Sequence, residues 1–295
     1  MSELGVGIIG CGNISSTYLK LGVLFKNIEI RAVADLNMDA AKSRAKEFGV
    51  DARTVDELLA SDDIDIIVNL TIPDAHFSVT KSILEAGKHA YSEKPLVLTL
   101  EEGESLRALS SEKNLRVGAA PDTVLGSAHQ LARRSIDEGL VGKIVAGTCH
   151  VMSHGMESWH PNPDFFFLPG AGPVLDVGPY YIANLINLIG PVKRVAALAS
   201  AASETRTIEK GDRKGETVPV KTPTNIHALL EFHNGATITL SASWDVWKHR
   251  HSNMELYGED GTIFVPDPNF FGGLVEFAGK DGDIKEGEGW NHVLG

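Results

Sequence analysis

The stretch GVGIIGCGNIS, residues 5–15, decides the fold, because an apolar strand in it runs into a glycine-rich turn and then into a helix. Two glycine patterns overlap in this stretch. Gly5-x-Gly7-x-x-Gly10 has the spacing of a dinucleotide-binding fingerprint, but it lies inside the predicted strand and is a false match. The segment after the strand, residues 10–15, has glycines where the chain must turn tightly and where a phosphate can approach the backbone. A strand, a glycine turn and a helix in this order predict the start of a Rossmann domain.

Each small residue of this loop has its own task in the prediction. Gly10 makes the turn, and Gly12 admits a pyrophosphate that the free N–H groups near Asn13 and Ile14 can bind at the start of the helix. Ser15 replaces the third Gly or Ala of the fingerprint and keeps a small side chain where helix and strand meet. A turn that needs positive φ for purely structural reasons would require the same glycines, so the pattern alone leaves that alternative open.

The chain as far as residue 118 alternates short apolar runs with amphipathic segments. The runs 28–34 and 64–70 are rich in β-branched residues and nearly unbroken, as expected for parallel strands buried on both faces. Helices are predicted for the amphipathic segments, which are residues 14–25, 38–48 and 75–86. The order βαβαβα predicts a doubly wound parallel α/β domain over residues 1–121.

Asp35 follows the second predicted strand directly. An acidic residue at this place of a Rossmann domain accepts hydrogen bonds from the adenosine ribose, and its charge repels a 2′-phosphate. Asp35 therefore favours NAD. Capping of the next helix is the alternative role for this aspartate. Because Arg31 and Arg44 flank the region, use of NADP stays open.

The pattern changes after residue 121. A helix is predicted at 127–137 and another at 180–189, with a long loop rich in proline and aromatic residues at 154–173. Strands are predicted at 144–151, 192–199, 226–232, 236–243 and 253–257. Asn234-Gly235 between two alternating runs predicts a β-hairpin. Residues 122–295 are therefore expected to form an α+β domain with an open, mostly antiparallel sheet, whose free face another subunit would cover.

Composition excludes several partners. The 39 Asp and Glu residues exceed the 27 Lys and Arg residues, so nucleic acid and anionic membranes are not expected to bind. Cys11 and Cys149 form no CxxC pair, which argues against a disulfide framework and a thiolate metal site. The first residues lack the pattern of a signal peptide, and no apolar run is long enough to span a membrane. We expect a cytoplasmic protein.

Two further motifs carry a resemblance to a known family. They are Thr71-Ile-Pro73-Asp-Ala-His76 and the Glu93-Lys94-Pro95 segment. Together with the loop at Gly10, Asp35 and residues 170–178, they make the chain similar, over nearly its whole length, to the glucose-fructose oxidoreductase, inositol dehydrogenase and MocA (Gfo/Idh/MocA) family. The resemblance implies an NAD(P)-dependent oxidoreductase that transfers hydride to or from a CH–OH carbon of a sugar, polyol or diol. It also implies cofactor contacts at Thr71, Pro73, His76, Glu93 and Lys94.

In similar proteins the lysine of the Glu-Lys-Pro motif reaches the reacting centre where the two domains meet, and the Lys-Pro bond is often cis. Lys94 would then be catalytic and would also contact the substrate. An ammonium suits this role, because it stabilises a carbonyl oxygen that gains negative charge as hydride is transferred. A solvated lysine at the end of a strand is the alternative.

Asp176 and Tyr180 are the other catalytic candidates. Asp176 can cap the following helix or, as in similar proteins, bind a substrate hydroxyl. Many family members have histidine four residues after this aspartate and a second aspartate three residues later, where this chain has Tyr180 and Ala183. The tyrosine resembles the glucose-fructose oxidoreductase and dihydrodiol dehydrogenase branches, in which it is the proposed proton donor, while Ala183 argues against an inositol dehydrogenase site. Tyr180 could instead be a packing aromatic.

The long loop supplies further substrate contacts. His154, Trp159, His160 and Asp164 combine donors, acceptors and one large apolar face, which suits a polyol. Asp122 is expected to line the same pocket. No third ligand accompanies His154 and His160 in a metal-site pattern, so no metal is expected. The three phenylalanines at 165–167 indicate core or a subunit contact.

Two other functions stay open. One is a catalytically silent NAD(P)-sensing or scaffold protein, against which the intact Lys94, Asp176 and Tyr180 argue. The other is an NAD-dependent glycosidase that works by transient oxidation. We expect a homo-oligomer, a dimer or tetramer, formed through the C-terminal sheet. Because family members usually continue for several tens of residues, and a new segment starts at Trp290, we also expect a C-terminal truncation.

Overall fold

The computed structural model describes residues 3–280 and 282–287, so the expected segment that starts at Trp290 lies outside the described residues. The chain divides between Ala120 and Pro121 into two compact units, which we call the N-terminal and the C-terminal unit. Within the described residues, no helix combines the length and the apolar character that crossing a bilayer requires.

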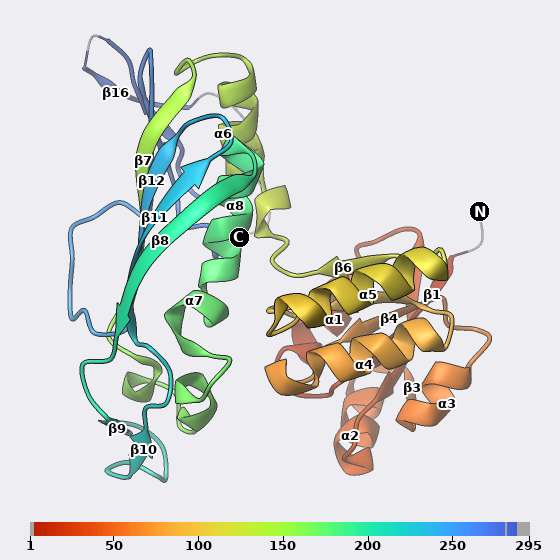
Figure 1. Ribbon diagram of the computed structural model, residues 1–295. Coiled ribbons are helices and arrows are strands. Elements are labelled where there is room, and N and C mark those ends of the chain that lie inside the picture. Colours follow the sequence, from red (N-terminus) through yellow and green to blue (C-terminus); the bar gives the residue numbers. More distant parts are fainter. Residues whose placement is uncertain (1–2, 281, 288–295) are drawn as a thin grey trace. The chain divides into compact units, whose positions relative to one another are not determined.

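The N-terminal unit is a six-stranded parallel sheet with helices on both faces (Figure 1). Its strands, in spatial order, are β3 (Asp51–Arg53), β2 (Ile28–Ala34), β1 (Leu4–Ile9), β4 (Ile66–Asn69), β5 (His89–Ser92) and β6 (Val117–Ala119). The helices are α1 (Ser15–Gly22), α2 (Met38–Phe48), α3 (Val55–Ala60), α4 (Pro73–Glu85) and α5 (Leu100–Glu112). This strand order is that of a Rossmann sheet, so the predicted fold class is confirmed.

Successive residues of β1 face two separate cores, which explains why its run is apolar throughout. Ile8 packs with residues of α1 and α2, whereas Ile9 packs with residues of α3, α4 and α5. The expected helix at 14–25 is too long, because the turn after α1 continues with i to i−3 hydrogen bonds, at Leu24 and Phe25. The predicted bounds of β2 and α2 agree with the structure.

The C-terminal unit is built on one eight-stranded sheet. In spatial order its strands are β16 (Ile284–Glu286), β15 (Glu276–Ala278), β14 (Thr262–Val265), β13 (Met254–Gly258), β7 (Ile144–Met152), β12 (Thr237–Ser243), β11 (Asn225–Phe232) and β8 (Val192–Ser200). β7 and β12 are parallel and the other neighbouring strands are antiparallel. The predicted mostly antiparallel sheet is therefore confirmed, and so is the hairpin at Asn234-Gly235, where Gly235 has φ 95°.

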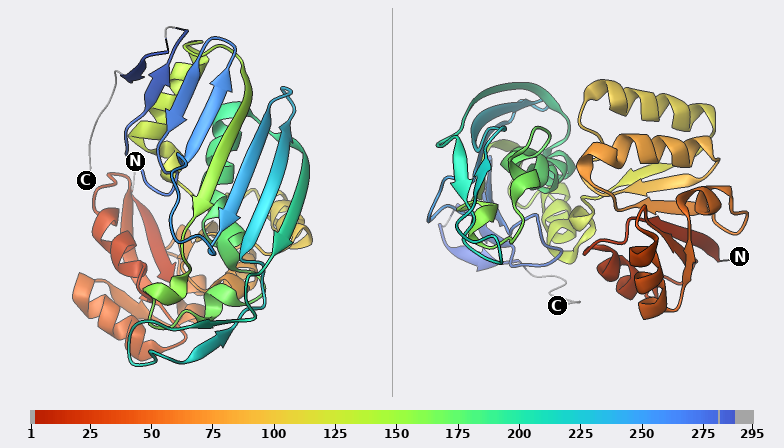
Figure 2. Two further views of the ribbon diagram at one scale, coloured as in Figure 1. Left: turned by 90° about the vertical axis from the view of Figure 1, so that its left-hand side faces the viewer. Right: turned by 90° about the horizontal axis from the view of Figure 1, so that it is seen from below.

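Helices cover one face of this sheet. α6 (Ser127–Asp137) and α8 (Gly178–Ile189) pack on it through a core that includes Leu131, Leu185 and Leu240. The opposite face carries no helix (Figure 2, left). Leu198 of β8 and Leu229 of β11 point to this open face and are 83% and 53% exposed. Exposed apolar side chains on a sheet face are typical of an interaction surface.

Loops gather at one edge of the sheet. Because β7 and β12 are parallel, the segments that follow them, 153–171 and 244–253, leave from the same edge. The segment 201–224 between β8 and β11 belongs to this edge too and contains β9 (Thr205–Thr207) and β10 (Thr217–Pro219). A small core forms among these segments, with Phe167 buried against Trp244. The prediction for the phenylalanine run fits Phe167, whereas Phe165 is half exposed.

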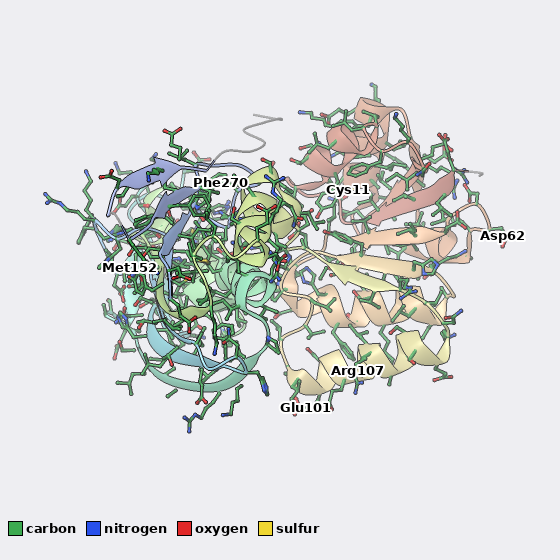
Figure 3. The ribbon with its side chains drawn as sticks, turned by 90° about the horizontal axis from the view of Figure 1, so that it is seen from above. Cys11, Asp62, Glu101, Arg107, Met152 and Phe270 are labelled. Carbon is green, nitrogen blue, oxygen red and sulfur yellow. The ribbon has the colours of Figure 1, made fainter. Side chains whose placement is uncertain are left out.

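His129 of α6 is buried between two hydrogen-bonding groups. The Asn184 side-chain amide donates to Nδ1 of His129 at 3.0 Å. Nε2 of the same ring donates to the carbonyl of Phe270, which is labelled in Figure 3, at 2.8 Å. This arrangement satisfies the neutral ring and leaves no acceptor for a second proton. Burial lowers the pKa of His129, and its hydrogen bond to Phe270 opposes this effect only in part.

Acid should therefore destabilise the C-terminal unit. The unfolded chain takes up a proton near pH 6.5, whereas folded His129 takes one up only at lower pH. The contribution of His129 to stability is therefore fully present above pH 6.5 and is lost as the pH drops below it. We expect His129→Gln to lower stability at pH 8 but to flatten its decline between pH 6.5 and 5. Tryptophan fluorescence during urea unfolding measures this, because all 4 tryptophans follow residue 121. Burial also lowers the pKa of His150, so part of the slope should remain. Parallel slopes for variant and wild type would contradict the assignment.

Candidate functional site

Four predicted site segments lie at the carboxyl edge of the parallel sheet in the N-terminal unit. The loop that contains Gly10 and Gly12 follows β1, Asp35 follows β2, Thr71 follows β4, and Lys94 follows β5. In an open α/β sheet of this strand order, ligands bind at this edge where the order reverses, between β1 and β4. The topology therefore brings these segments together.

Gly10 occupies a position that only glycine can fill. Its φ is +105°, and its N–H donates to the carbonyl of Ala34 at 2.9 Å. A Cβ at this position would lie 2.5 Å from the carbonyl oxygen of Leu70, at the end of β4. The turn after β1 thus depends both on a left-handed backbone and on close approach to the neighbouring segment.

The next residues fit a pyrophosphate. A Cβ at Gly12 would meet nothing within 4 Å, so the backbone is open to a ligand there. In the described part of the chain, the N–H groups of Gly12, Asn13 and Ile14 donate to no other group. Ser15 is buried, and its Oγ donates to the Gly12 carbonyl at 2.6 Å, which holds the loop against α1. Unused N–H groups at a helix N-terminus are a binding site for anions.

Asp35 joins the ends of two strands. Its carboxylate accepts the N–H groups of Cys11 and Asn37, each at 2.8 Å (Figure 3 labels Cys11). Asn37, not Asp35, is the N-cap of α2, so the capping alternative for Asp35 is wrong. A carboxylate has about four acceptor positions, so Asp35 retains capacity for ribose hydroxyls. Burial and the nearby charge of Asp35 raise the pKa of the Cys11 thiol to about 11, which keeps it protonated at neutral pH.

Both flanking arginines have acceptors within the protein. Arg31 binds Glu29 and the carbonyl of Asp63. Arg44 pairs with Glu47 at 2.7 Å and donates to the carbonyl of Gly12 at 3.2 Å. Arg44 therefore supports the glycine loop.

The segment after β4 is tied to the segment after β5. Asn69 accepts the hydroxyl of Thr71 at 2.6 Å, and Pro73 opens α4. The buried His76 ring lies between two backbone carbonyls, with Nε2 3.0 Å from that of Thr71 and Nδ1 2.6 Å from that of Pro95. His76 thus holds the Glu-Lys-Pro motif in place through its backbone.

Glu93 fixes the same motif from the other side. Its carboxylate accepts the hydroxyl of Tyr18 at 3.0 Å and the N–H of Lys94 at 3.1 Å, and its own N–H donates to the carbonyl of Asn69. The Lys94–Pro95 bond is cis, as the family resemblance implied. Lys94 itself is half-buried. Backbone contacts on both sides therefore set the position of this lysine.

In the C-terminal unit, Asp176 ends the short helix α7 (Gly172–Asp176), and Tyr180 lies in the first turn of α8. The N-cap of α8 is Val177, so the capping alternative for Asp176 is wrong. Tyr180 is half-buried and packs partly against the core beneath the sheet. Packing and a chemical role are compatible for a tyrosine in this environment, because its ring and its hydroxyl contact different surroundings.

The loop expected to contact the substrate forms an aromatic contact, with a residue after β12, that was not predicted from the sequence. The ring of His154 stacks on Trp247, with centroids 3.5 Å apart, and Trp247 is 79% exposed. Trp159 is half exposed and meets the edge of the His160 ring. A tryptophan just beyond an alternating strand, where no core position is expected, was the available signal for Trp247.

Two other residues expected to contact the substrate, Asp164 and Asp122, form contacts within the C-terminal unit. Asp164 forms an ion pair with Arg213 at 2.6 Å, and the hydrogen bond from this guanidinium lowers the pKa of Asp164. Asp122 precedes a 3-10 turn, and its carbonyl accepts the N–H of Leu125. Over residues 3–280 and 282–287, no group of three or more His, Cys, Asp or Glu side chains could hold a metal ion.

Comparisons with known proteins cover both units. A model described as "Oxidoreductase family, NAD-binding Rossmann fold" matches residues 4–120, and one described as "GFO/IDH/MocA C-terminal domain" matches residues 129–264. Levoglucosan dehydrogenase of Pseudarthrobacter phenanthrenivorans is 26% identical over 292 residues, which cover 89% of this chain and 73% of that protein. The 1,5-anhydro-D-fructose reductase of Ensifer adhaerens is 23% identical, with 87% and 74% covered. A solved levoglucosan dehydrogenase complex with NADH and L-sorbose matches the fold with a TM-score of 0.82 at 23% identity, covering 97% of this chain and 80% of that one.

The two glycines of the loop should respond differently to an added methyl group. Gly10→Ala forces a left-handed alanine against the Leu70 carbonyl, so we expect it to destabilise the protein by about 1–3 kcal/mol. Gly12→Ala meets open space, so we expect little change in stability but at least a tenfold rise in the Kd for NADH. Urea unfolding and calorimetric titration measure the two effects. An unchanged Kd for Gly12→Ala would show that the ligand does not approach this backbone.

Proposed function

The chain belongs to the Gfo/Idh/MocA family of NAD-dependent oxidoreductases, and from this premise we propose that it oxidises or reduces a CH–OH carbon of a sugar, polyol or diol. The names of two relatives, levoglucosan dehydrogenase and 1,5-anhydro-D-fructose reductase, support a sugar-like substrate. The observation that carries the proposal is the placement of Lys94 directly after β5, at the same sheet edge as the Gly10–Gly12 loop.

The cofactor contacts follow from the geometry of that edge. NAD supplies the nicotinamide carbon that accepts hydride from the substrate or returns it. We assign the pyrophosphate to the N–H groups from Gly12 to Ile14 and the adenosine ribose to Asp35. The segments after β4 and β5 complete the cofactor site, with contacts assigned to Thr71, Pro73, Glu93 and Lys94. Because both nitrogens of the His76 ring face backbone carbonyls, we assign it to holding these segments in place.

We assign the handling of the substrate hydroxyl proton to Lys94 and Tyr180. In the oxidative direction Tyr180 starts as a phenolate. The substrate O–H bond breaks and its proton passes to the phenolate oxygen, while the C=O bond forms and the C–H electron pair leaves as hydride, which the nicotinamide carbon would accept. The Lys94 ammonium stabilises the negative charge on the substrate oxygen during this transfer. In the reductive direction Tyr180 returns the proton. General acid–base catalysis of this kind contributes about 10²–10⁴-fold.

The remaining candidate residues hold the substrate. Asp176 accepts a hydrogen bond from a neighbouring hydroxyl, and His154 and His160 supply further polar contacts. Trp159 offers an apolar face to the ring carbons. Asp122 is assigned to the same group. Because the backbone of Lys94 is held by its neighbours, we attribute a large part of the rate to positioning.

Removal of the proton-handling groups should abolish most turnover but not cofactor binding. We expect Lys94→Ala and Tyr180→Phe to lower kcat by about 10²–10⁴-fold, in line with general acid–base catalysis. The assay follows the absorbance of reduced nicotinamide while sugars, inositols and diols are offered with NAD or NADP. Tyr257→Phe is the matched control, because its hydroxyl binds Glu255 on the same strand, β13, and it should keep wild-type turnover.

Several outcomes would contradict the assignment. Full turnover by Lys94→Ala with normal NADH affinity would exclude Lys94 from the chemistry. If the wild type binds NADH but turns over no compound of the panel, the result would favour an NAD(P)-sensing protein. Tightly held cofactor without net reduction would favour a redox-assisted glycosidase.

We also propose that a second copy of the chain covers the open sheet face and forms a homo-oligomer. Leu198 and Leu229 support this, because both are apolar and exposed on that face. We expect Leu198→Glu to weaken self-association at least tenfold, since each interface would bury a charge. Sedimentation velocity measures the change, with Leu36→Glu on the N-terminal unit as the control, because Leu36 is even more exposed than Leu198. Unchanged association of Leu198→Glu would contradict this interface.

A further inference from the structure

A buried ion cluster lies beneath the loop that carries the proposed substrate contacts. The cluster consists of Glu157 on the loop, Arg206 on β9 and Asp245 after β12. Their side chains are only 3%, 11% and 14% exposed, respectively. Two carboxylates thus share one guanidinium in a setting from which water is largely removed.

Arg206 connects three segments that are distant in sequence. One terminal nitrogen donates to Glu157 Oε1 at 3.0 Å, and the other donates to Asp245 Oδ1. The guanidinium carbon also lies 5.9 Å from the centre of the buried Phe167 ring. A planar guanidinium with donors in a fixed fork can join two carboxylates and stack on an aromatic face at the same time.

The cluster acts on the middle of the substrate-facing segment. Glu157 lies midway between His154 and His160, so its fixation constrains both ends of the segment 154–160. The loop here has only a short 3-10 turn and no ladder of strand hydrogen bonds over residues 156–158. Backbone hydrogen bonds tie the segment to its neighbours at Gly155 and at Glu157, and side-chain contacts must supply the rest of the order that a regular element would supply.

Asp245 extends the same constraint to the aromatic stack. Its backbone forms an isolated bridge with His154, and its second carboxylate oxygen accepts the hydroxyl of Thr224 at 2.8 Å. Trp247, two residues further on, stacks on the ring of His154. Arg206 therefore contacts both Glu157, which follows His154 in the loop, and Asp245, whose backbone pairs with that of His154.

We propose that Arg206, through Glu157 and Asp245, is a positioning residue that fixes the 154–160 segment in the geometry that binds substrate. This inference rests on the proposed function, because it assigns a task to the loop that the function requires. Without the guanidinium, two buried carboxylates would face each other unpaired, and the segment would be expected to leave this position. Arg206 touches no reacting atom in this proposal.

Arg213, which lies with Arg206 in the segment 201–224, provides a matched control. Arg213 pairs with Asp164, but these two side chains are 33% and 43% exposed. Exposed ion pairs contribute little to order, because water and salt screen them. Removal of Arg213 should therefore leave the segment in place, whereas removal of Arg206 should release it.

The first test separates substrate binding from chemistry. We expect Arg206→Met to raise the KM for the sugar or polyol at least tenfold, while kcat and the KM for NAD stay within about threefold, as for loss of binding that is equal in ground and transition states. Arg206→Lys keeps the charge but not the fork and should lie between Arg206→Met and wild type. Arg213→Met should match the wild type. An unchanged KM for Arg206→Met would overturn the proposal.

The second test does not depend on turnover. Hydrogen–deuterium exchange on the full chain should be at least tenfold faster over residues 154–160 in Arg206→Met and unchanged over the N-terminal unit. If Arg206→Met does not fold, Glu157→Ala and Glu157→Gln replace it, since Gln keeps the oxygen that accepts from Arg206 and Ala does not. Equal exchange in Ala and Gln variants would overturn the proposal. If the wild type turns over no member of the panel, the proposed function fails, while the exchange data still decide whether Arg206 orders the segment.

Discussion

The hydrogen bond from the Cys11 N–H to the Asp35 carboxylate is the interaction on which the carboxyl edge of the parallel sheet depends. It joins the end of β1 to the end of β2, while Gly10 brings the same turn against the carbonyl of Leu70 at the end of β4. Three neighbouring strands thus converge on one turn. Because this turn needs a positive φ and leaves no room for a Cβ, one glycine decides whether the edge forms.

The contacts continue along the sheet to Lys94. Asn69 at the end of β4 accepts the N–H of Glu93, and His76 links the carbonyls of Thr71 and Pro95. Lys94 therefore sits in a backbone that neighbouring segments hold from both sides. A long flexible side chain is best placed for chemistry when its backbone does not move. In the C-terminal unit, the buried guanidinium of Arg206 orders the 154–160 segment in a comparable way.

Sequence reasoning succeeded where local signals mark an element. The bounds of α2 agree with prediction because Asn37 caps its start and Gly49 ends it in a left-handed conformation. Capping boxes at Thr54 with Glu57 and at Thr99 with Glu102 begin α3 and α5, two helices that the analysis did not predict. Those signals were available in the sequence. β3 has only three residues, and β5 has the sequence HAYS without an apolar run, so neither carries a recognisable pattern.

Long-range pairings account for what the sequence could not predict in the candidate site. Arg206 is 49 residues from Glu157 and 39 from Asp245, and nothing near it in the sequence indicates either partner. Lys94 was recognised because the motif around it is contiguous. The alternative of a helix cap, for Asp35 and for Asp176, failed because in each case the residue that caps the helix lies one or two positions further on.

Calorimetric titration of the chain with NADH and with NADPH tests the assignment of the cofactor edge most directly. We expect NADH to bind at least tenfold more tightly, a difference of about 1.4 kcal/mol, because the Asp35 carboxylate accepts ribose hydroxyls and repels a 2′-phosphate. Equal or tighter binding of NADPH would contradict the role of Asp35, and absence of binding by both would contradict the NAD-dependent function itself.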